Sequence, residues 1–200
     1  MTIHIFGGGT VQHVRNHMGL CAPAYGTTAR NLFDLLGPNI ARLHLTRMAD
    51  YQSSMETNED VAARLQEVLA DPATRAVVFN VALCDYEGKI GDIESGKYAQ
   101  RLSSREGAQA MTLTPTRKLL QLVKATRPDV FLVGFKTTAN ASTREQHRLS
   151  LRQIDETAAD VVFANDTVTR HNLLVFPDGL YMGEREGMLD ELLKELRRLA

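Results

Sequence analysis

The 200-residue sequence has only two cysteines, Cys21 and Cys84, which stand far apart and form no C-x-x-C pair. Such sparse cysteine is typical of a reduced compartment, and a chain of this length can fold without disulfides or metal. No run of 18 apolar residues occurs, so we expect no membrane span. The N-terminal MTIHIFGGGT lacks the basic leader of a secretory signal. We therefore expect a cytoplasmic protein that does not enter a membrane.

The charge of the chain is nearly balanced, with a formal net charge of -1 at pH 7. Proteins that bind nucleic acid usually have a basic excess, so this balance argues against that class. The six histidines do not cluster with the cysteines, and we expect no metal site built from the chain alone. No G-x-S-x-G surrounds a serine, which argues against a hydrolase triad. The length fits one domain, spanning residues 1–200.

Strand-like and helix-like patterns alternate along the chain. Strands are expected at 2–6, 40–45, 76–83, 130–135 and 160–164, and helices at 28–36, 58–69, 114–125, 142–157 and 189–199. This alternation predicts an α/β fold, with a parallel sheet and helices on both of its faces. Asn58 is expected to cap the second helix. Ligands of such sheets bind outside the carboxyl ends of the strands.

Three segments fall outside the alternation. Residues 11–27 have an irregular pattern with glycine and proline. Residues 87–110 are rich in glycine, serine and charge, which predicts a long flap or binding loop. Near the C-terminus, Phe176-Pro-Asp-Gly-Leu180 is typical of a hairpin.

The first strand is expected to end in a tight turn, Gly7-Gly8-Gly9-Thr10. Glycine lets backbone N–H groups approach an anion closely, so the turn suits a nucleotide or phosphorylated ligand. The G-x-G-x-x-G fingerprint would need glycine where Gln12 stands, and no P-loop motif occurs. A strand-end turn without a ligand is the alternative.

A carboxylate follows one further expected strand, and cationic side chains lie on two of the expected helices. Asp85 ends the most apolar strand, where it could bond a ribose or base, or cap the next turn. Cations at 114–118 stand where a helix is expected to start, which suits a docked anion or a solvated basic turn. Arg144, Arg148 and Arg152 share one helix face and could hold a phosphate. The alternative is a solvent face whose arginines pair with nearby acids.

Taken in order, these motifs resemble phosphopantothenoylcysteine synthetase, the synthetase half of a bifunctional coenzyme A biosynthesis protein. The matching segments are GGGT at 7–10, Val14-Arg15, Gly26, VALCDY at 81–86, Leu113-Thr114, Val133-Gly134-Phe135 and Ala164-Asn165-Asp166. The resemblance implies a Rossmann-like fold, a homodimer and small-molecule substrates. It also implies CTP or ATP with Mg²⁺, used to activate a carboxylate as an acyl-nucleotidyl intermediate that the amine of cysteine attacks.

The resemblance assigns roles residue by residue. Implied nucleotide-binding residues are Gly8, Gly9, Ala82, Asp85, Thr116, Arg117, Lys118, Leu119, Phe135, Arg148 and Arg152. Implied substrate-binding residues are Arg15, Gly19, Cys21, Ala22 and Asn165. A flap lysine of the family, which acts on the acyl intermediate, corresponds to Arg101, or to Lys97 one helical turn earlier.

The sequence departs from the family in the substrate loop. The family reads N-x-S-S-G where this chain has Gly19-Leu20-Cys21-Ala22-Pro23, so a changed acid or amine substrate is possible. Arg101 keeps the charge of the flap lysine but has a different geometry. The flavin-dependent decarboxylase half is absent from the sequence. A nicotinamide-dependent oxidoreductase and a non-catalytic nucleotide-binding module are the alternative functions.

Overall fold

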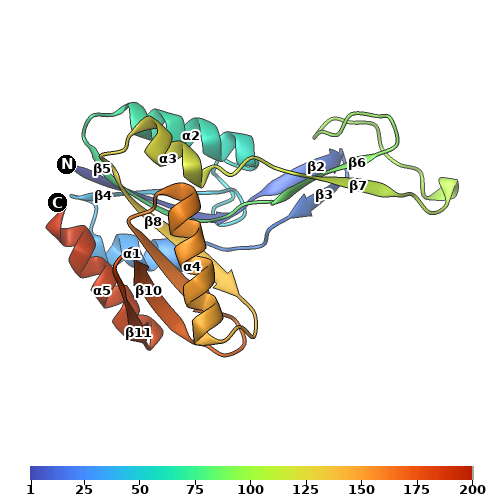
Figure 1. The fold of residues 1–200 in the computed structure, drawn as a ribbon. Helices are drawn as coiled ribbons and strands as arrows, with labels where there is room; N and C mark the ends of the chain where they lie inside the picture. Colours follow the sequence, from blue (N-terminus) through green and yellow to red (C-terminus); the bar gives the residue numbers. More distant parts are fainter. Residues whose placement is uncertain (200) are drawn as a thin grey trace.

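A computed structural model describes residues 1–199. Seven strands form one sheet in the order β11-β10-β9-β8-β5-β1-β4 (Figure 1). The strands are β1 (Thr2–Gly9), β4 (Ala41–Leu45), β5 (Thr74–Ala82), β8 (Phe131–Thr138), β9 (Val161–Asp166), β10 (Asn172–Phe176) and β11 (Gly179–Gly183). The first five are mutually parallel, and the β10–β11 hairpin adds two antiparallel strands at one edge. The predicted α/β fold and C-terminal hairpin are confirmed.

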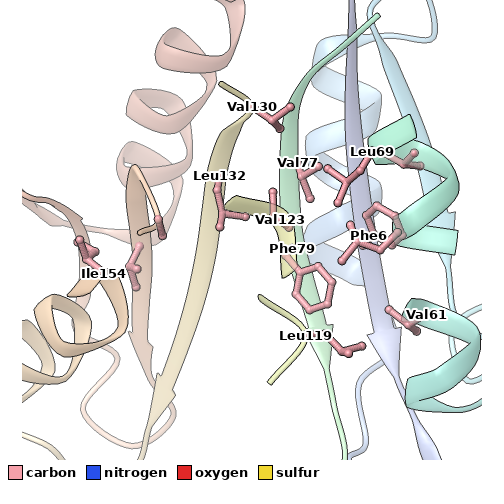
Figure 2. Packing of buried hydrophobic residues seen from close by; sticks show 14 of the residues in the cluster. Phe6, Val61, Leu69, Val77, Phe79, Leu119, Val123, Val130, Leu132 and Ile154 are labelled. Carbon is pink, nitrogen blue, oxygen red and sulfur yellow. The ribbon is translucent and has the colours of Figure 1, made fainter. Parts of the chain in front are cut away.

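Five helices cover the two faces of this sheet. They are α1 (Thr27–Leu36), α2 (Asn58–Ala70), α3 (Leu120–Thr126), α4 (Thr143–Thr157) and α5 (Arg185–Arg198). Helices α2, α3 and α4 pack on one face, where Phe6, Val77, Phe79 and Leu132 of the strands meet Val61 and Val123 of the helices (Figure 2). Helices α1 and α5 close the other face around Phe163. None of the helices within 1–199 has the length and apolar character needed to cross a membrane.

Four shorter strands form an arm that extends away from the sheet (Figure 1). The hairpin β2 (Val11–Arg15) and β3 (Met18–Cys21) lies in the region predicted to be irregular. The ribbon β6 (Tyr86–Ile90) and β7 (Met111–Pro115) frames the predicted flap, which also contains a short 3-10 turn at Ser104–Glu106. A hairpin pattern in 11–21 was obscured because its strands are short and the burial of β2 does not alternate.

The predicted helix start at 114–115 is wrong, since β7 continues through Pro115 and α3 begins only at Leu120. Cross-strand pairing decides this segment, because Thr114 pairs with Glu87 and Pro115 pairs with Tyr86. Proline is tolerated at the end of such a two-stranded ribbon, where its missing N–H breaks no central ladder. The cations at 117–118 therefore lie in the connection between ribbon and helix.

The predicted cap of α2 is also wrong by one residue. Thr57 is the N-cap: its hydroxyl accepts from the N–H of Asp60, whose carboxylate accepts from the N–H of Thr57 in a capping box. Asn58 is instead buried and donates to Cys84 O. A threonine three residues before an acid satisfies two helix N–H groups at once, which a cap at Asn58 could not do here.

The glycines after residue 6 form part of β1 rather than a turn, because Gly8 pairs with Val81 and Gly9 with Ala82. They are small because the chain packs closely on them. A Cβ on Gly8 would lie 2.2 Å from Thr46 Oγ1, and its φ of +105° suits glycine. A Cβ on Gly9 would lie 2.0 Å from Ala22 O and 2.7 Å from Ala24 N. The glycine run lets the base of the arm lie against the end of β1.

Gly9→Ala is expected to destabilise the protein by about 3 kcal/mol, because the new methyl group must displace backbone atoms rather than a flexible side chain. Chemical denaturation followed by circular dichroism measures this. Gly96→Ala is the matched control, since nothing lies within 4 Å of the Cβ it adds. Equal stability of the two variants would contradict the close packing at Gly9.

Candidate functional site

A cavity of about 890 Å³ opens at the carboxyl ends of the strands β5 and β8. Its walls come from the segment 23–28 at the start of α1, from 79–83 and Asp85 after β5, and from 135–137 of β8. Helices α3, α4 and α5 supply the remaining walls. This is the edge at which parallel α/β sheets bind ligands, so the cavity lies where the strand order predicts a ligand site.

Four cations and two carboxylates line the cavity: Lys118, Lys136, Arg152 and Arg185 against Asp85 and Glu156. Two of the cations are neutralised, because Lys118 pairs with Asp85 and Arg152 Nε lies 2.7 Å from Glu156 Oε1. Lys136 and Arg185 have no ion-pair partner in the described part of the chain. The cavity therefore has an excess of positive charge, which suits an anionic ligand.

Asp85 comes together with Thr116 and Lys118, although these two residues lie 31 and 33 positions further along the sequence. The N–H of Thr116 donates to Asp85 O at 2.9 Å, and the Thr116 hydroxyl donates to Cys84 O at 2.7 Å. The Asp85 side chain is 65% exposed and Lys118 binds it at the cavity wall. Arg117, by contrast, does not line the cavity, and Leu119 is buried in the core.

Thr10 supplies a support for this region that the sequence did not reveal. Its hydroxyl donates to Asn58 Oδ1 at 2.7 Å and accepts from the N–H of Cys84 at 2.9 Å. Asn58 Nδ2 donates in turn to Cys84 O at 2.8 Å. This closed network fixes the backbone just before Asp85. Burial raises the pKa of the Cys84 thiol, and its hydrogen bonds do not reverse that shift, so the thiol stays neutral near pH 7.

Gly8 and Gly9 do not line the cavity. Their missing side chains make room for Thr46, Ala22 and Ala24 of the protein itself. Ala82, which pairs with Gly9, does line it. A role of the glycines in nucleotide binding stays a prediction, and their packing at the base of the arm already accounts for their size.

The arginines of α4 divide between the two alternatives left open by their spacing. Arg148 forms two hydrogen bonds with Glu145, at 2.8 and 2.6 Å, and lies outside the cavity. That bond from Arg148 lowers the pKa of Glu145. Arg152 lines the cavity while paired to Glu156. Arg148 and Arg152 thus have the partner acids of a solvent face, whereas Arg144 forms no ion pair within residues 1–199. Arg152 also faces the site.

Phe135, within β8, and Asn165, near the end of β9, both line the cavity. The ring of Phe135 stacks on Phe163, with centroids 5.4 Å apart. This contact holds an aromatic face at the cavity wall. Thr137 Oγ1 donates to Asn165 Oδ1 at 3.2 Å, which orients the amide.

The structure places the two flap cations outside the cavity. Lys97 forms an ion pair with Glu56, whose other oxygen lies 3.6 Å from His13 Nε2. The hydrogen bond from Lys97 is the main cause that lowers the pKa of Glu56. Arg101 is exposed and makes no hydrogen bond or ion pair with residues 1–199. Lys97 is therefore held at the base of the arm, and Arg101 is free.

The residues implied to bind the acid substrate lie mainly in the arm. Arg15 is almost fully buried and donates to the backbone oxygens of Val14 (2.8 Å), Ile90 (2.5 Å) and Ile93 (3.4 Å). It therefore joins the β2–β3 hairpin to the flap. Gly19, Cys21 and Ala22 belong to β3 or follow it directly, and they do not line the cavity.

Sequence reasoning missed two cationic lining residues, Lys136 and Arg185. Lys136 directly follows Phe135 at the carboxyl end of a strand, so the strand-end rule could have identified it. Arg185 begins the closing helix and is brought to the site only by the packing of α5 against α1. No local pattern signals that contact.

Comparison with known proteins gives a match in sequence and several in structure. No protein-family model matches the chain. The coenzyme A biosynthesis bifunctional protein CoaBC of Thermococcus kodakarensis is 31% identical over 114 residues, which cover 57% of this chain and 27% of that protein. The chain thus matches about a quarter of the length of this curated relative.

The solved structures share the fold over nearly the whole chain. The DNA/pantothenate metabolism flavoprotein of Streptococcus pneumoniae superposes with a TM-score of 0.84 at 18% identity, with complete coverage of both chains. The C-terminal domain of a CoaBC protein gives 0.70 at 15% identity, covering 98% of this chain and 94% of that one. A Cab2 variant in complex with phosphopantothenate-cysteine gives 0.64 at 14% identity, covering 98% and 85%. The sequence relative and the shared fold together confirm the resemblance to the synthetase half of the bifunctional coenzyme A biosynthesis proteins.

Proposed function

We propose that the protein is a nucleotide-dependent amide ligase that joins 4'-phosphopantothenate, or an analogue of it, to the amine of cysteine. The observation that carries the proposal is the cavity itself, which combines an excess of cations with an aromatic wall at the carboxyl edge of the sheet. The similar proteins support it, because the Thermococcus kodakarensis relative is a coenzyme A biosynthesis protein and a Cab2 variant of the same fold was solved with phosphopantothenate-cysteine.

The reaction needs a carboxylate to become an electrophile. An oxygen of the acid attacks the α-phosphorus of CTP or ATP, and pyrophosphate leaves with the electrons of the broken P–O bond. The amine of cysteine then attacks the acyl carbon, the nucleoside monophosphate leaves and the amine gives up a proton. Both steps depend on positioning and on positive charge near the phosphates, rather than on an elaborate acid–base set.

The lining residues suit these tasks. Asp85 can accept hydrogen bonds from the hydroxyl or amino groups of a nucleoside, and Phe135 contributes an aromatic ring to the wall of the same cavity. Lys118, Lys136 and Arg152 provide charge for phosphate oxygens, since each lines the same cavity. Asn165 can orient the acid substrate from the end of β9. Four further residues would act through backbone atoms or through contacts outside the cavity: Gly8, Gly9, Thr116 and Arg148.

Mg²⁺ is expected to enter with the nucleotide. Residues 1–199 contain no group of three or more histidine, cysteine, aspartate or glutamate side chains that could hold a metal. Mg²⁺ is commonly held by one or two carboxylates together with substrate phosphates, and Asp85 is an exposed carboxylate at the cavity. The residues present therefore fit a metal that is carried by the triphosphate, where it would neutralise charge on the leaving pyrophosphate.

We also propose one functional domain over residues 1–200, a homodimer and a cytoplasmic location. The exposed apolar side chains of the arm, Tyr86, Met111 and Leu113, support the dimer, because an extended ribbon with such a surface suits a second copy of the chain. Two free cysteines support a reducing compartment. Sedimentation velocity tests the dimer, and a monomer at micromolar concentration would contradict it.

Calorimetric titration with CTP and ATP in the presence of Mg²⁺ tests the nucleotide site. We expect one of the two to bind, and Asp85→Ala to weaken its affinity about tenfold through the lost hydrogen bonds to the nucleoside. The same variant should weaken cytidine or adenosine, whose lack of phosphate removes any gain from the freed Lys118. Asp34→Ala, on the exposed side of α1, is the control. Absence of binding by either nucleotide would contradict the proposal.

A further inference from the structure

Arg185 is a cation of the cavity whose side chain is held in place by two contacts but whose positive charge has no acidic partner within residues 1–199. It is the first residue of α5, and its Nη2 donates to Thr28 Oγ1 of α1 at 2.6 Å. Its Cζ lies 5.4 Å from the centroid of the Phe163 ring, in cation–π geometry. The guanidinium group is thus held on two sides while it lines the cavity.

The charge of Arg185 lacks compensation within residues 1–199. Burial lowers the pKa of Arg185, and the charge of Glu186 partly opposes that shift without forming an ion pair. Arginine remains protonated in proteins, so the protein retains a half-buried positive charge here. The nearby start of α1 adds to it, because this helix has no acid in its first turn and no side-chain cap.

The free donors of Arg185 have the geometry that a phosphate group needs. Guanidinium has five N–H donors, and one of them is used by Thr28. The planar fork can bind two oxygens of one phosphate, and a side chain that is already fixed loses little entropy on binding. Hydrogen bonding to Thr28 and stacking on Phe163 therefore prepare the residue for an anion.

Arg185 and Lys136 lie on opposite faces of the same sheet edge. Phe135 packs in the α1/α5 core, whereas a Cβ on Gly134 would meet Gln153 of α4, so Lys136 points to the α4 side. Both residues line the cavity and both lack an ion-pair partner there. A ligand with more than one negative group can reach across the edge between them.

We propose that Arg185 is a phosphate-binding residue on the α1/α5 wall of the cavity. The proposal rests on the proposed function for the identity of the ligand, which is either the nucleotide or the phosphorylated acid. The chemistry of the contact is the same in both cases: a planar guanidinium group binds two phosphate oxygens. The two sources are separated by the titrations below.

The test compares Arg185→Gln, Arg185→Lys and a control, Arg198→Gln, at the far and exposed end of the same helix. Tripolyphosphate, CTP, ATP and 4'-phosphopantothenate are each titrated into the full-length protein by calorimetry at low ionic strength. We expect Arg185→Gln to bind tripolyphosphate about tenfold more weakly or worse, Arg185→Lys to lie in between, and Arg198→Gln to equal the wild type. If affinity is lost for the nucleotides alone, or for phosphopantothenate alone, that result identifies which ligand supplies the phosphate that Arg185 binds.

A purely structural role predicts a different pattern. If Arg185 only ties α5 to α1, Arg185→Gln should lower the melting temperature and weaken cytidine, adenosine and pantothenate as much as their phosphorylated forms. If it binds phosphate, Arg185→Gln should weaken the phosphorylated ligands while cytidine, adenosine and pantothenate keep the wild-type affinity, even if loss of the contacts with Thr28 and Phe163 lowers the melting temperature. Phosphate affinity within twofold of the wild type would overturn the proposal. Tripolyphosphate binding does not require turnover, so a failed ligase assay leaves this result readable.

Discussion

Replacing Asp166 with alanine is expected to lower the melting temperature by about 10 °C, the largest stability effect expected of a substitution at a single polar side chain here. The residue is 2% exposed at the end of β9 and joins the two loops beside that strand. Its carboxylate accepts hydrogen bonds from Asn140 N (3.0 Å), Ala141 N (2.9 Å), Val168 N (2.9 Å), Thr169 N (2.8 Å) and Thr138 Oγ1 (2.7 Å). Alanine leaves four backbone N–H groups without that acceptor.

Differential scanning calorimetry measures the effect, with Asp178→Ala as the matched control in the exposed turn before β11. The melting temperature of Asp166→Asn should lie between those of the wild type and Asp166→Ala. The amide oxygen of asparagine replaces one carboxylate acceptor, while its NH₂ group faces other donors. The left-handed Asn140, at a φ of +59°, depends on the same carboxylate. A melting temperature of Asp166→Ala within 2 °C of the control would contradict this role.

The same residue predicts how stability responds to acid. Burial alone would raise the pKa of Asp166, but hydrogen bonds from Ala141, Thr169, Thr138 and Val168 outweigh it and hold the pKa far below the usual 3.8. A carboxyl group with a depressed folded pKa stabilises the protein above its unfolded pKa, and this stabilisation is lost as the pH falls toward the folded value. Between pH 5 and pH 2, the wild type should therefore lose stability more steeply than Asp166→Ala.

Arg101→Ala is expected to reduce the rate of amide formation about a hundredfold while nucleotide affinity stays within twofold. The family resemblance assigns the acyl intermediate to a flap cation, and Arg101 or Lys97 could serve. Lys97 would have to leave its ion pair with Glu56, whereas Arg101 is exposed and unpaired in the described residues. Movement of the flap, or its supply by a second copy of the chain, would bring Arg101 to the cavity.

Measurement of kcat and of nucleotide affinity for Arg101→Ala, Lys97→Ala and the control Lys89→Ala separates the two candidates. Lys89 belongs to the same ribbon and pairs with Glu94, so it controls for loss of a flap cation. Lys97→Ala should cost less than tenfold in kcat. An unchanged rate in Arg101→Ala beside a lost rate in Lys97→Ala would transfer the role to Lys97.

The sequence predicted the elements that depend on local patterns. Periodicity located the five parallel strands, and the strand-end rule placed Asp85, Phe135 and Asn165 at one cavity. It failed where partners distant in sequence decide the outcome. Pro115 was expected to begin a helix, but it pairs with Tyr86 in a ribbon. Local sequence does not show this pairing, because the two residues lie far apart in the chain. The predicted role of Gly8 and Gly9 in ligand binding stays a prediction, and Thr46 and Ala22 fill the space beside them.

The charged residues of the site could likewise not be assigned from local sequence patterns alone. The spacing of the α4 arginines left a solvent face and a phosphate clamp open, and only three-dimensional contacts separate Arg148, outside the cavity, from Arg152, within it. Arg185 could not be found from the sequence, because its contacts are with Thr28 and Phe163, which lie 157 and 22 positions earlier in the chain. The fold class can thus be predicted from the sequence pattern, whereas the residues that line the cavity are brought together only by the packing of the helices and strands.

The most direct test of the proposed function is detection of the amide product by mass spectrometry, with CTP or ATP, Mg²⁺, 4'-phosphopantothenate and cysteine supplied to the purified protein. We expect phosphopantothenoylcysteine, or the amide of a close analogue of the acid, together with equal amounts of pyrophosphate and nucleoside monophosphate. Nucleotide binding without any amide product or pyrophosphate, across these acids and both nucleotides, would contradict the ligase function and leave a nucleotide-binding module.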